Sequence, residues 1–250
     1  DDLSDPSARA FRAWLLERVL GHLRKLHELR GQTEGATMKQ GVVYEQLTRL
    51  SAATGNWKDA RELGEKTQTI FREILERDGP SQSARDGLLL ALVLTGDALR
   101  NIENDDQALE RYEEALRLAK SMASAGEEAD STKLCLAISL RRVGDIQERK
   151  GQLDKALRAY DASLARCRAL VASDPKAIQY KGNLATSLFH VGDIHMRRRE
   201  FELSFVAHDE ALKLCHEVLK ANPLSDRAQQ LLVLIAQARF DAHEARGDLA

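Results

Sequence analysis

The chain has 250 residues and a mass of 27.9 kDa, which is long enough to bury a sizeable core. Its 37 Lys and Arg are balanced by 39 Asp and Glu, so the formal charge of -2 disfavours a nucleic-acid partner. Aromatic residues make up only 5% of the chain, a composition that favours helices and excludes an all-β fold. Three cysteines do not suit a disulfide framework, and no stretch approaches the roughly 20 apolar residues of a membrane span. We therefore expect a cytoplasmic protein without a membrane partner.

The N-terminal segment is predicted to form a helix that caps the repeats. A helix expected at residues 7–30 carries a broad apolar stripe that includes Phe11, Trp14 and Leu26. We predict an N-terminal capping helix within 1–36, followed by one continuous domain of helical repeats over 37–250. Because the chain begins at Asp1 without a methionine, we also expect it to be a piece of a larger protein, whose other domains are possible partners.

An internal repeat is the strongest signal in the sequence. Gly96, Gly144 and Gly192 are evenly spaced, with a period of 48 in the residue numbering, and an aspartate follows each of them. Asp241 continues the aspartate series, but Phe240 stands where the next glycine would be. Other columns with the same spacing hold leucine, alanine or an aromatic residue, among them Leu88, Leu136, Leu184 and Leu232, Ala108, Ala156 and Ser204, and Tyr112, Tyr160 and His208.

Each repeat predicts two amphipathic helices, because apolar residues recur at steps of three and four. Short breaks at Gly55, Asn104 and Gly151 separate the two helices of a pair, and Pro80, Pro175 and Pro223 mark the connections between pairs. We expect ten helices, at residues 7–30, 37–54, 57–77, 81–102, 105–124, 130–149, 153–172, 176–198, 201–221 and 225–246.

The spacing of small and aromatic residues resembles the tetratricopeptide repeat (TPR). In the repeat that contains Gly144, the residues Ala156, Tyr160 and Leu164 follow this glycine at offsets of 12, 16 and 20. The usual TPR has about 34 residues, so this chain resembles a long form, similar to the repeats of bacterial signalling proteins. The resemblance implies an all-α fold, a right-handed superhelical solenoid of stacked antiparallel helix pairs, whose concave inner wall is lined by the first helix of each pair.

Positions spaced by three and four residues on each first helix share one face and are our candidates for the inner wall. The predicted partner-binding residues are Val93, Asp97, Arg100, Arg141, Asp145, Arg149, Phe189, Asp193, Met196 and Arg197. A ladder of carboxylates flanked by guanidinium groups would bind an extended or helical peptide. In the alternative interpretation, the aspartates tie neighbouring repeats together through hydrogen bonds or ion pairs. Some TPR domains clamp a peptide carboxylate with amides where this chain has Asp145 and Asp193, which argues against such a clamp.

No catalytic, cofactor or metal motif accompanies the repeat. The scattered histidines lack a His-Glu-x-x-His or Cys-x-x-Cys context, and neither a glycine-rich phosphate loop nor a Gly-x-Ser-x-Gly motif occurs. We therefore expect no enzyme, no cofactor and no metal, but a scaffold that binds a protein or peptide in a concave groove. The alternative is a regulatory or sensor region of a larger bacterial ATPase, kinase or protease. An enzyme that uses Asp145 and Asp193 as acid and base is the third hypothesis.

Overall fold

The computed structural model describes residues 14, 18, 37–125 and 129–246, and this part of the chain contains helices but no strand. The helices are α2 (Met38–Ala53), α3 (Trp57–Asp78), α4 (Gln82–Asn101), α5 (Asp105–Ser124), α6 (Asp130–Arg149), α7 (Leu153–Ser173), α8 (Ile178–Arg197), α9 (Phe201–Ala221) and α10 (Asp226–Arg246). They agree within a few residues with the nine ranges predicted for residues 37–246. The predicted capping helix lies outside the described residues, apart from Trp14 and Arg18.

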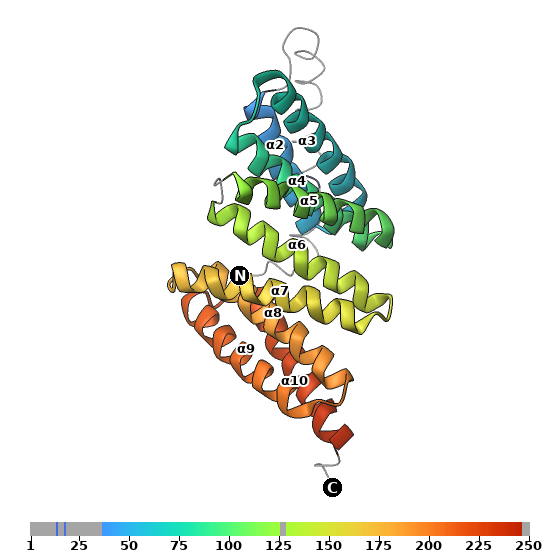
Figure 1. Ribbon diagram of the computed structural model, residues 1–250, viewed down its shortest axis with the longest axis vertical. Helices are drawn as coiled ribbons and strands as arrows, with labels where there is room; N and C mark the ends of the chain where they lie inside the picture. Colours follow the sequence, from blue (N-terminus) through green and yellow to red (C-terminus); the bar gives the residue numbers. More distant parts are fainter. Residues whose placement is uncertain (1–13, 15–17, 19–36, 126–128, 247–250) are drawn as a thin grey trace. The chain divides into compact units, whose positions relative to one another are not determined.

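The chain divides into two compact units, Asp1–Glu127 and Glu128–Ala250. In the first unit, α2 pairs with α3 and α4 pairs with α5. In the second unit, α6 pairs with α7 and α8 with α9, and α10 follows (Figure 1). Within each unit the first helices of successive pairs are adjacent, α2 with α4, and α6 with α8 and α8 with α10. The single continuous domain expected over 37–250 stays a prediction, because the two units are described separately.

The turn inside each helix pair uses the same backbone conformation. Gly55, Glu103, Gly151 and Arg199, which occupy the same position in successive repeats, all have positive φ angles, of 77°, 61°, 72° and 61°. A left-handed residue reverses the chain within a few residues, and glycine adopts it without the steric cost that a side chain adds. Asn56 and Asn104 then cap the following helix by accepting a hydrogen bond from a backbone amide three residues on. The breaks predicted from sequence are therefore real turns.

A ring from the second helix of a pair packs on a glycine of the first helix. A Cβ atom added at Gly96 would lie 2.5 Å from Tyr112, and one added at Gly144 would lie 2.5 Å from Tyr160. At Gly192 the ring is that of His208, also at 2.5 Å. Any side chain at these glycines would therefore collide with the ring. The glycines permit this close helix contact, and the group that packs on each glycine is the aromatic ring.

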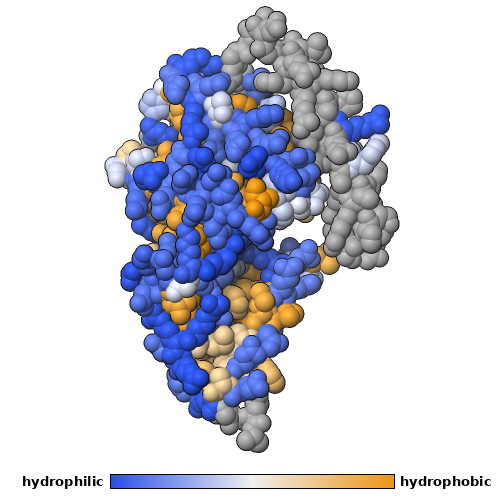
Figure 2. Space-filling view, turned by 90° about the vertical axis from the view of Figure 1, so that its right-hand side faces the viewer, coloured by the Kyte–Doolittle hydropathy of each residue, from blue (hydrophilic) through white to orange (hydrophobic). Residues whose placement is uncertain are grey.

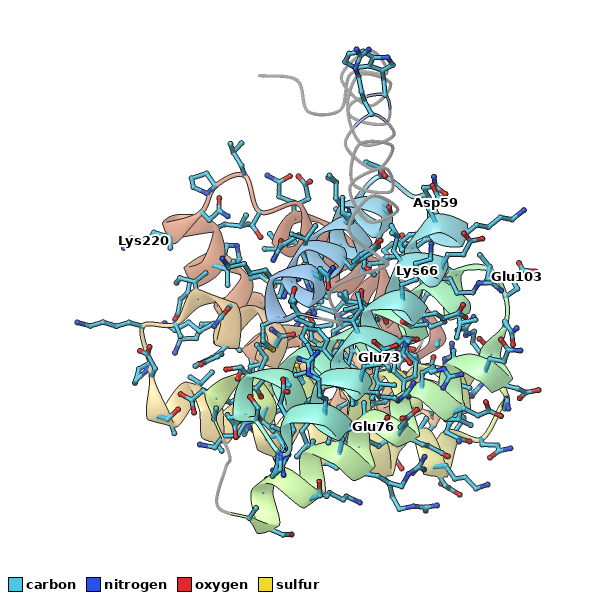
Figure 3. All side chains as sticks on the ribbon, turned by 90° about the horizontal axis from the view of Figure 1, so that it is seen from above. Asp59, Lys66, Glu73, Glu76, Glu103 and Lys220 are labelled. Carbon is cyan, nitrogen blue, oxygen red and sulfur yellow. The ribbon has the colours of Figure 1, made fainter. Side chains whose placement is uncertain are left out.

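The outer surface of the first unit is charged. Figure 3 labels Asp59, Lys66, Glu73 and Glu76 along α3, and the last three of these are exposed. Arg72 of the same helix donates a hydrogen bond to Glu114 of α5 at 2.6 Å. The second unit has a matching pair between its second helices, α7 and α9, where Arg168 donates to Glu210 at 2.7 Å. The second helices of successive pairs are thus joined at their exposed faces by ion pairs, which contribute little individually.

Replacement of Gly144 by alanine should destabilise the protein by about 1–3 kcal/mol, because the new methyl group would overlap the Tyr160 ring. Gly182, inside α8, is the matched control, since no atom lies within 4 Å of a Cβ added there. Gly182→Ala should stabilise the protein by about 0.5–1 kcal/mol through helix propensity. Urea unfolding of both variants measures the difference. Equal stabilities would contradict the packing of Tyr160 on Gly144.

Candidate functional site

In the second unit, α6 and α8 bring together charged and polar side chains, joined by one tyrosine from α7. We call this group the polar cluster, and its members are Arg141, Arg142, Asp145, Glu148, Tyr160, His190, Asp193 and Arg197. Asp145 and Tyr160 are buried, whereas Arg197 reaches solvent. Buried ionic groups are costly unless they are paired, so the contacts within the cluster decide what it can do.

Asp145 is the buried centre of the polar cluster. Its carboxylate accepts hydrogen bonds from the Tyr160 hydroxyl at 3.1 Å and from Arg142 at 3.2 Å. The Arg141 guanidinium lies 4.0 Å from it, and His190 Nε2 lies 3.8 Å away. These partners compensate the burial of the carboxylate, so Asp145 primarily holds α6, α7 and α8 together.

Two further carboxylates, those of Glu148 and Asp193, lie nearer to solvent than Asp145. The single proton of the Tyr160 hydroxyl is shared between Asp145 and Glu148 of α6, whose carboxylate oxygen lies 2.7 Å from the hydroxyl oxygen. Arg197 of α8 contacts Glu148 at 2.9 Å and Asp193 at 3.2 Å, which bridges the two helices. Burial raises the pKa of Glu148 and of Asp193, while the Arg197 charge opposes this effect at both groups. Arg197 therefore keeps two desolvated carboxylates in place at the edge of the cluster.

His190 is neutral at pH 7. Its pKa is lowered to about 4, mainly by burial and also by the charges of Arg141 and Arg142, against the attraction of Asp145. Its ring stacks on that of Tyr160, with centroids 4.8 Å apart. A neutral imidazole in this position packs as an aromatic group and adds no charge to the cluster.

Helix α10 extends the polar surface of α8. Arg227 donates hydrogen bonds to the Thr186 hydroxyl at 3.0 Å and to the Asn183 side-chain oxygen at 3.4 Å. The three first helices of the second unit therefore share a layer of polar groups whose positions are fixed by contacts between helices.

The first unit has a corresponding contact between a tyrosine and an aspartate, with fewer members than the polar cluster. The Tyr112 hydroxyl donates to Asp97 at 2.6 Å, just as Tyr160 donates to Asp145. Val93 is only 4% exposed and belongs to the core, so it offers almost no surface to a partner. Arg100 is half-buried. The aspartate in each unit is thus held by the tyrosine that packs on the preceding glycine.

The third glycine contact lacks the tyrosine. His208 is fully buried and stacks on Phe189, with centroids 5.9 Å apart. Among the described residues, neither of its ring nitrogens has a hydrogen-bond partner of standard geometry. Its pKa is lowered to about 4, mainly by burial and also by the Arg239 charge, while the Phe189 backbone and Asp209 act in the opposite direction. His208 is therefore a neutral ring in the place of a tyrosine.

The structure brings together only some of the predicted wall residues. Asp145, Asp193 and Arg197 belong to the polar cluster, and so does Arg141, which is 4% exposed and therefore has little surface for a ligand. Phe189 and Met196 are half-buried on α8, and Arg149 is exposed at the end of α6. Val93, Asp97 and Arg100 lie in the other unit, so a single wall through all ten residues stays a prediction.

Sequence reasoning missed two residues of this surface, Arg142 and Arg227, and it counted His190 only among the scattered histidines that lack a metal motif. Arg142 follows Arg141 directly, and a helical projection places it near the edge of the predicted face. Arg227 contacts residues more than 40 positions earlier, and no local pattern predicts such a contact. In the described part of the chain, no three His, Cys, Asp or Glu side chains are placed to hold a metal ion.

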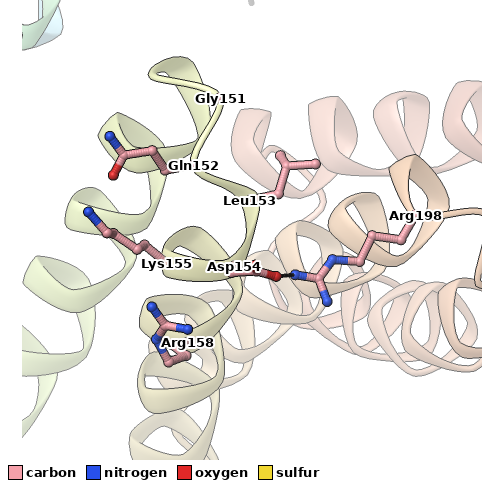
Figure 4. A pocket seen from close by; sticks show the side chains of 7 residues that line it. All are labelled: Gly151, Gln152, Leu153, Asp154, Lys155, Arg158 and Arg198. Atoms are coloured by element: carbon pink, nitrogen blue, oxygen red, sulfur yellow. Dashed lines mark hydrogen bonds and ion pairs between the residues drawn. The ribbon is translucent and has the colours of Figure 1, made fainter.

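A shallow depression of about 610 Å³ lies at the turn between α6 and α7 (Figure 4). Asp154 and Arg198 form an ion pair across it, and the basic side chains of Lys155 and Arg158 also line it. Asp154, Lys155 and Arg158 are all exposed. The depression therefore lacks the desolvated groups of a specific ligand site. None of the helices in the described residues is long and apolar enough to cross a bilayer.

No protein-family model matches the chain, and no curated protein is similar to it in sequence. Among solved structures, the apo form of RapI is similar with a TM-score of 0.63 and 12% identity, over 94% of this chain and 80% of RapI. BtubC from P. vanneervenii has a TM-score of 0.59 and 17% identity, over 94% of this chain and 92% of its own. These matches confirm the all-α helical-repeat fold of stacked helix pairs, and at such identities they show the fold alone.

NprR in complex with its cognate peptide NprX matches with 19% identity, over 93% of this chain and 71% of NprR. Its TM-score of 0.37 is too low to support an inference about this protein.

Replacement of His208 by phenylalanine should make the protein less sensitive to acid. His208 has a pKa of about 4 in the folded state, against 6.5 for an unperturbed histidine, so its contribution to stability is complete above pH 6.5 and is lost towards pH 4. The loss is worth up to about 3 kcal/mol. Between pH 7 and pH 4, the free energy of unfolding should fall less in His208→Phe than in the wild type.

His208→Tyr is the companion variant. Its hydroxyl should reach Asp193 as the Tyr160 hydroxyl reaches Asp145, so we expect it to be more stable than His208→Phe by about 1 kcal/mol at pH 7. Comparison with the wild type isolates His208, because His190, Glu148 and Asp193 titrate in all three proteins. Parallel pH profiles of wild type and His208→Phe would contradict the burial of a neutral ring.

Proposed function

We propose that the chain is a non-catalytic scaffold that binds a peptide or a protein along the layer formed by α6, α8 and α10, in a groove on that side of the helix pairs. The observation that supports this proposal is the position of Arg197. It is 47% exposed, yet its guanidinium is held by Glu148 and Asp193 on two different helices. An arginine that is already ordered loses little entropy on binding.

The surroundings of Arg197 suit a peptide. Phe189, Asp193 and Met196 lie on the same face of α8, at steps of three and four residues, and Phe189 and Met196 are half-buried. Arginine and aromatic side chains are enriched among residues that dominate binding energy. A fixed cation beside apolar side chains fits a peptide with an acidic or carbonyl oxygen next to an apolar residue.

Truncation of Arg197, which is exposed, therefore measures the proposal better than truncation of Arg141, which is 4% exposed and lies beside the buried Asp145 carboxylate. If the chain is instead a regulatory region of a larger signalling protein, we expect its ligand to bind to the same layer of α6, α8 and α10. We also propose that the protein is cytoplasmic, that it binds a protein or peptide partner, and that it has no catalytic activity.

Panning the full chain against a displayed library of random peptides should select ligands of this layer. For a selected peptide, Arg197→Ala should weaken binding by about tenfold, or about 1.4 kcal/mol. Arg158→Ala, which removes an exposed arginine from α7, should change the affinity by less than about twofold, because second helices lie outside the layer. Circular dichroism checks that both variants fold. A library that yields no ligand, or ligands that depend on Arg158, would overturn the proposal.

A further inference from the structure

Helix α2 exposes apolar side chains. Among residues 37–125, the large apolar side chains that are exposed, Val42, Val43 and Leu50, all lie on this helix. Val43 is 38% exposed and Leu50 is 42% exposed. Together with the exposed Gln46 they follow one stripe at steps of three and four residues, and we call Val43, Gln46 and Leu50 the α2 face. Hydrophobic surface is visible in the upper part of Figure 2, at the height at which Figure 1 shows the first unit.

The later repeats bury the positions that α2 exposes. At the position of Val43, the helices α4, α8 and α10 have residues that are at most 1% exposed, namely Ala91, Ser187 and Ile235. At the position of Leu50, the same three helices have fully buried residues, namely Ala98, Ile194 and Ala242. Each of these helices packs against the second helix that precedes it in the chain, which is α3, α7 or α9. The α2 face therefore has the composition of a surface that such a preceding helix covers.

Two buried polar pairs show how a second helix meets the first helix that follows it. In the second unit, the Oγ atoms of Ser163 on α7 and Ser187 on α8 lie 3.1 Å apart. In the first unit, Gln68 of α3 donates a hydrogen bond to Thr95 of α4 at 2.7 Å. Carried back by whole periods of 48, these pairs become position 19 against Val43 and position 20 against Leu47. A helix that covers α2 in the same way would bring these positions together.

The segment before α2 has the pattern of a second helix. Residues 9–30 stand one period of 48 before Trp57–Asp78 of α3. Eight residues of α3 are buried, and at six of the corresponding positions the segment has an apolar residue: Leu15, Leu16, Val19, Leu20, Leu23 and Leu26. The other two positions hold Arg12 and His22. Trp14, which is 50% exposed, stands at the position of the exposed residues Glu62, Glu110, Arg158 and Val206.

The four residues that would meet are all apolar. Val19 and Val43 stand where the buried serine pair lies in the second unit, and Leu20 and Leu47 stand where glutamine and threonine form their hydrogen bond. Apolar residues in place of both partners keep such a contact satisfied, whereas a change in one partner leaves a buried polar group unpaired. Both partners differ in both pairs, so the two pairs indicate the same register between the segment and α2.

We propose that residues 9–30 of this chain cover the α2 face, packed antiparallel on α2 as a second helix without a first helix of its own. The sequence predicts a capping helix, and the structure supplies the surface and the register for it. The connection over residues 31–37 has a length that is usual between packed helices. Because it is tethered so closely, the segment binds in preference to a separate molecule. The α2 face belongs to the first unit, so it is separate from the layer of the proposed function.

A disulfide tests the register in the full chain. The serine Oγ atoms at the corresponding positions are 3.1 Å apart, so Val19→Cys combined with Val43→Cys should form a disulfide on oxidation. Mass spectrometry of the digested monomer should find the peptides that contain positions 19 and 43 joined. Arg18→Cys with Val43→Cys is the matched control, because Arg18 is exposed, and its yield should be at least about tenfold lower. The single variants measure the background from the native cysteines, Cys135, Cys167 and Cys215.

The free energy of the contact is tested by urea unfolding. Val43→Asp should lower the midpoint by about 1 M, because the charge is either buried unpaired or displaces the segment. Val206→Asp is the matched control, since Val206 is also the sixth residue of its helix and is 68% exposed. It should shift the midpoint by less than about 0.3 M. Val19→Asp should act like Val43→Asp, and the double variant should lose little more than either, because both changes break one contact.

Three results would overturn the proposal. One is the absence of a 19–43 disulfide within the monomer, which includes a disulfide formed only between two chains. Another is an equal disulfide yield from positions 18 and 19. The third is a midpoint shift for Val43→Asp no larger than that for Val206→Asp, which would mean that solvent alone covers the α2 face.

Discussion

The packing of a ring on a glycine is the constraint on which the rest of this structure depends. Because Gly96 and Gly144 have no side chain, the rings of Tyr112 and Tyr160 pack directly against the first helix of the pair, and the two helices come close. The close approach carries the hydroxyl of each tyrosine past the helix crossing to the aspartate that follows the glycine. A larger residue at the glycine would move the hydroxyl away and leave a buried carboxylate short of a donor.

The electrostatics of the second unit follow from that contact. Tyr160 joins Asp145 to Glu148, and Arg197 joins Glu148 to Asp193, so the charges are fixed in a chain from the core to the solvent. The buried end of this chain stabilises the stacking of helices, and only the exposed end has surface to offer a ligand. The contacts of Asp145 agree with the interpretation of the aspartate column as a tie between helices, and its interpretation as a binding surface stays a proposal for the surroundings of Arg197.

The helices could be predicted from the sequence because apolar periodicity and turn residues are local. The glycine column could also be recognised from the sequence, and small residues are needed wherever helices approach closely. The contact between Tyr160 and Asp145 was not predicted, because helical projection places Asp145 on the inner face and does not show that a hydroxyl from α7 reaches it. The pKa of His190 and the contacts of Arg227 depend on residues far along the chain, and no pattern within one helix contains them.

The left-handed turn residues restrict where insertions and deletions can occur in such a chain. Gly55, Glu103, Gly151 and Arg199 fix the reversal within each pair, and an extra residue there would rotate the second helix and take its ring off the glycine. The connections between pairs are under no such restraint. Insertions and deletions acquired during divergence should therefore accumulate between one pair and the next, for example near Asp174 and Asn222, while the reversals keep a constant length.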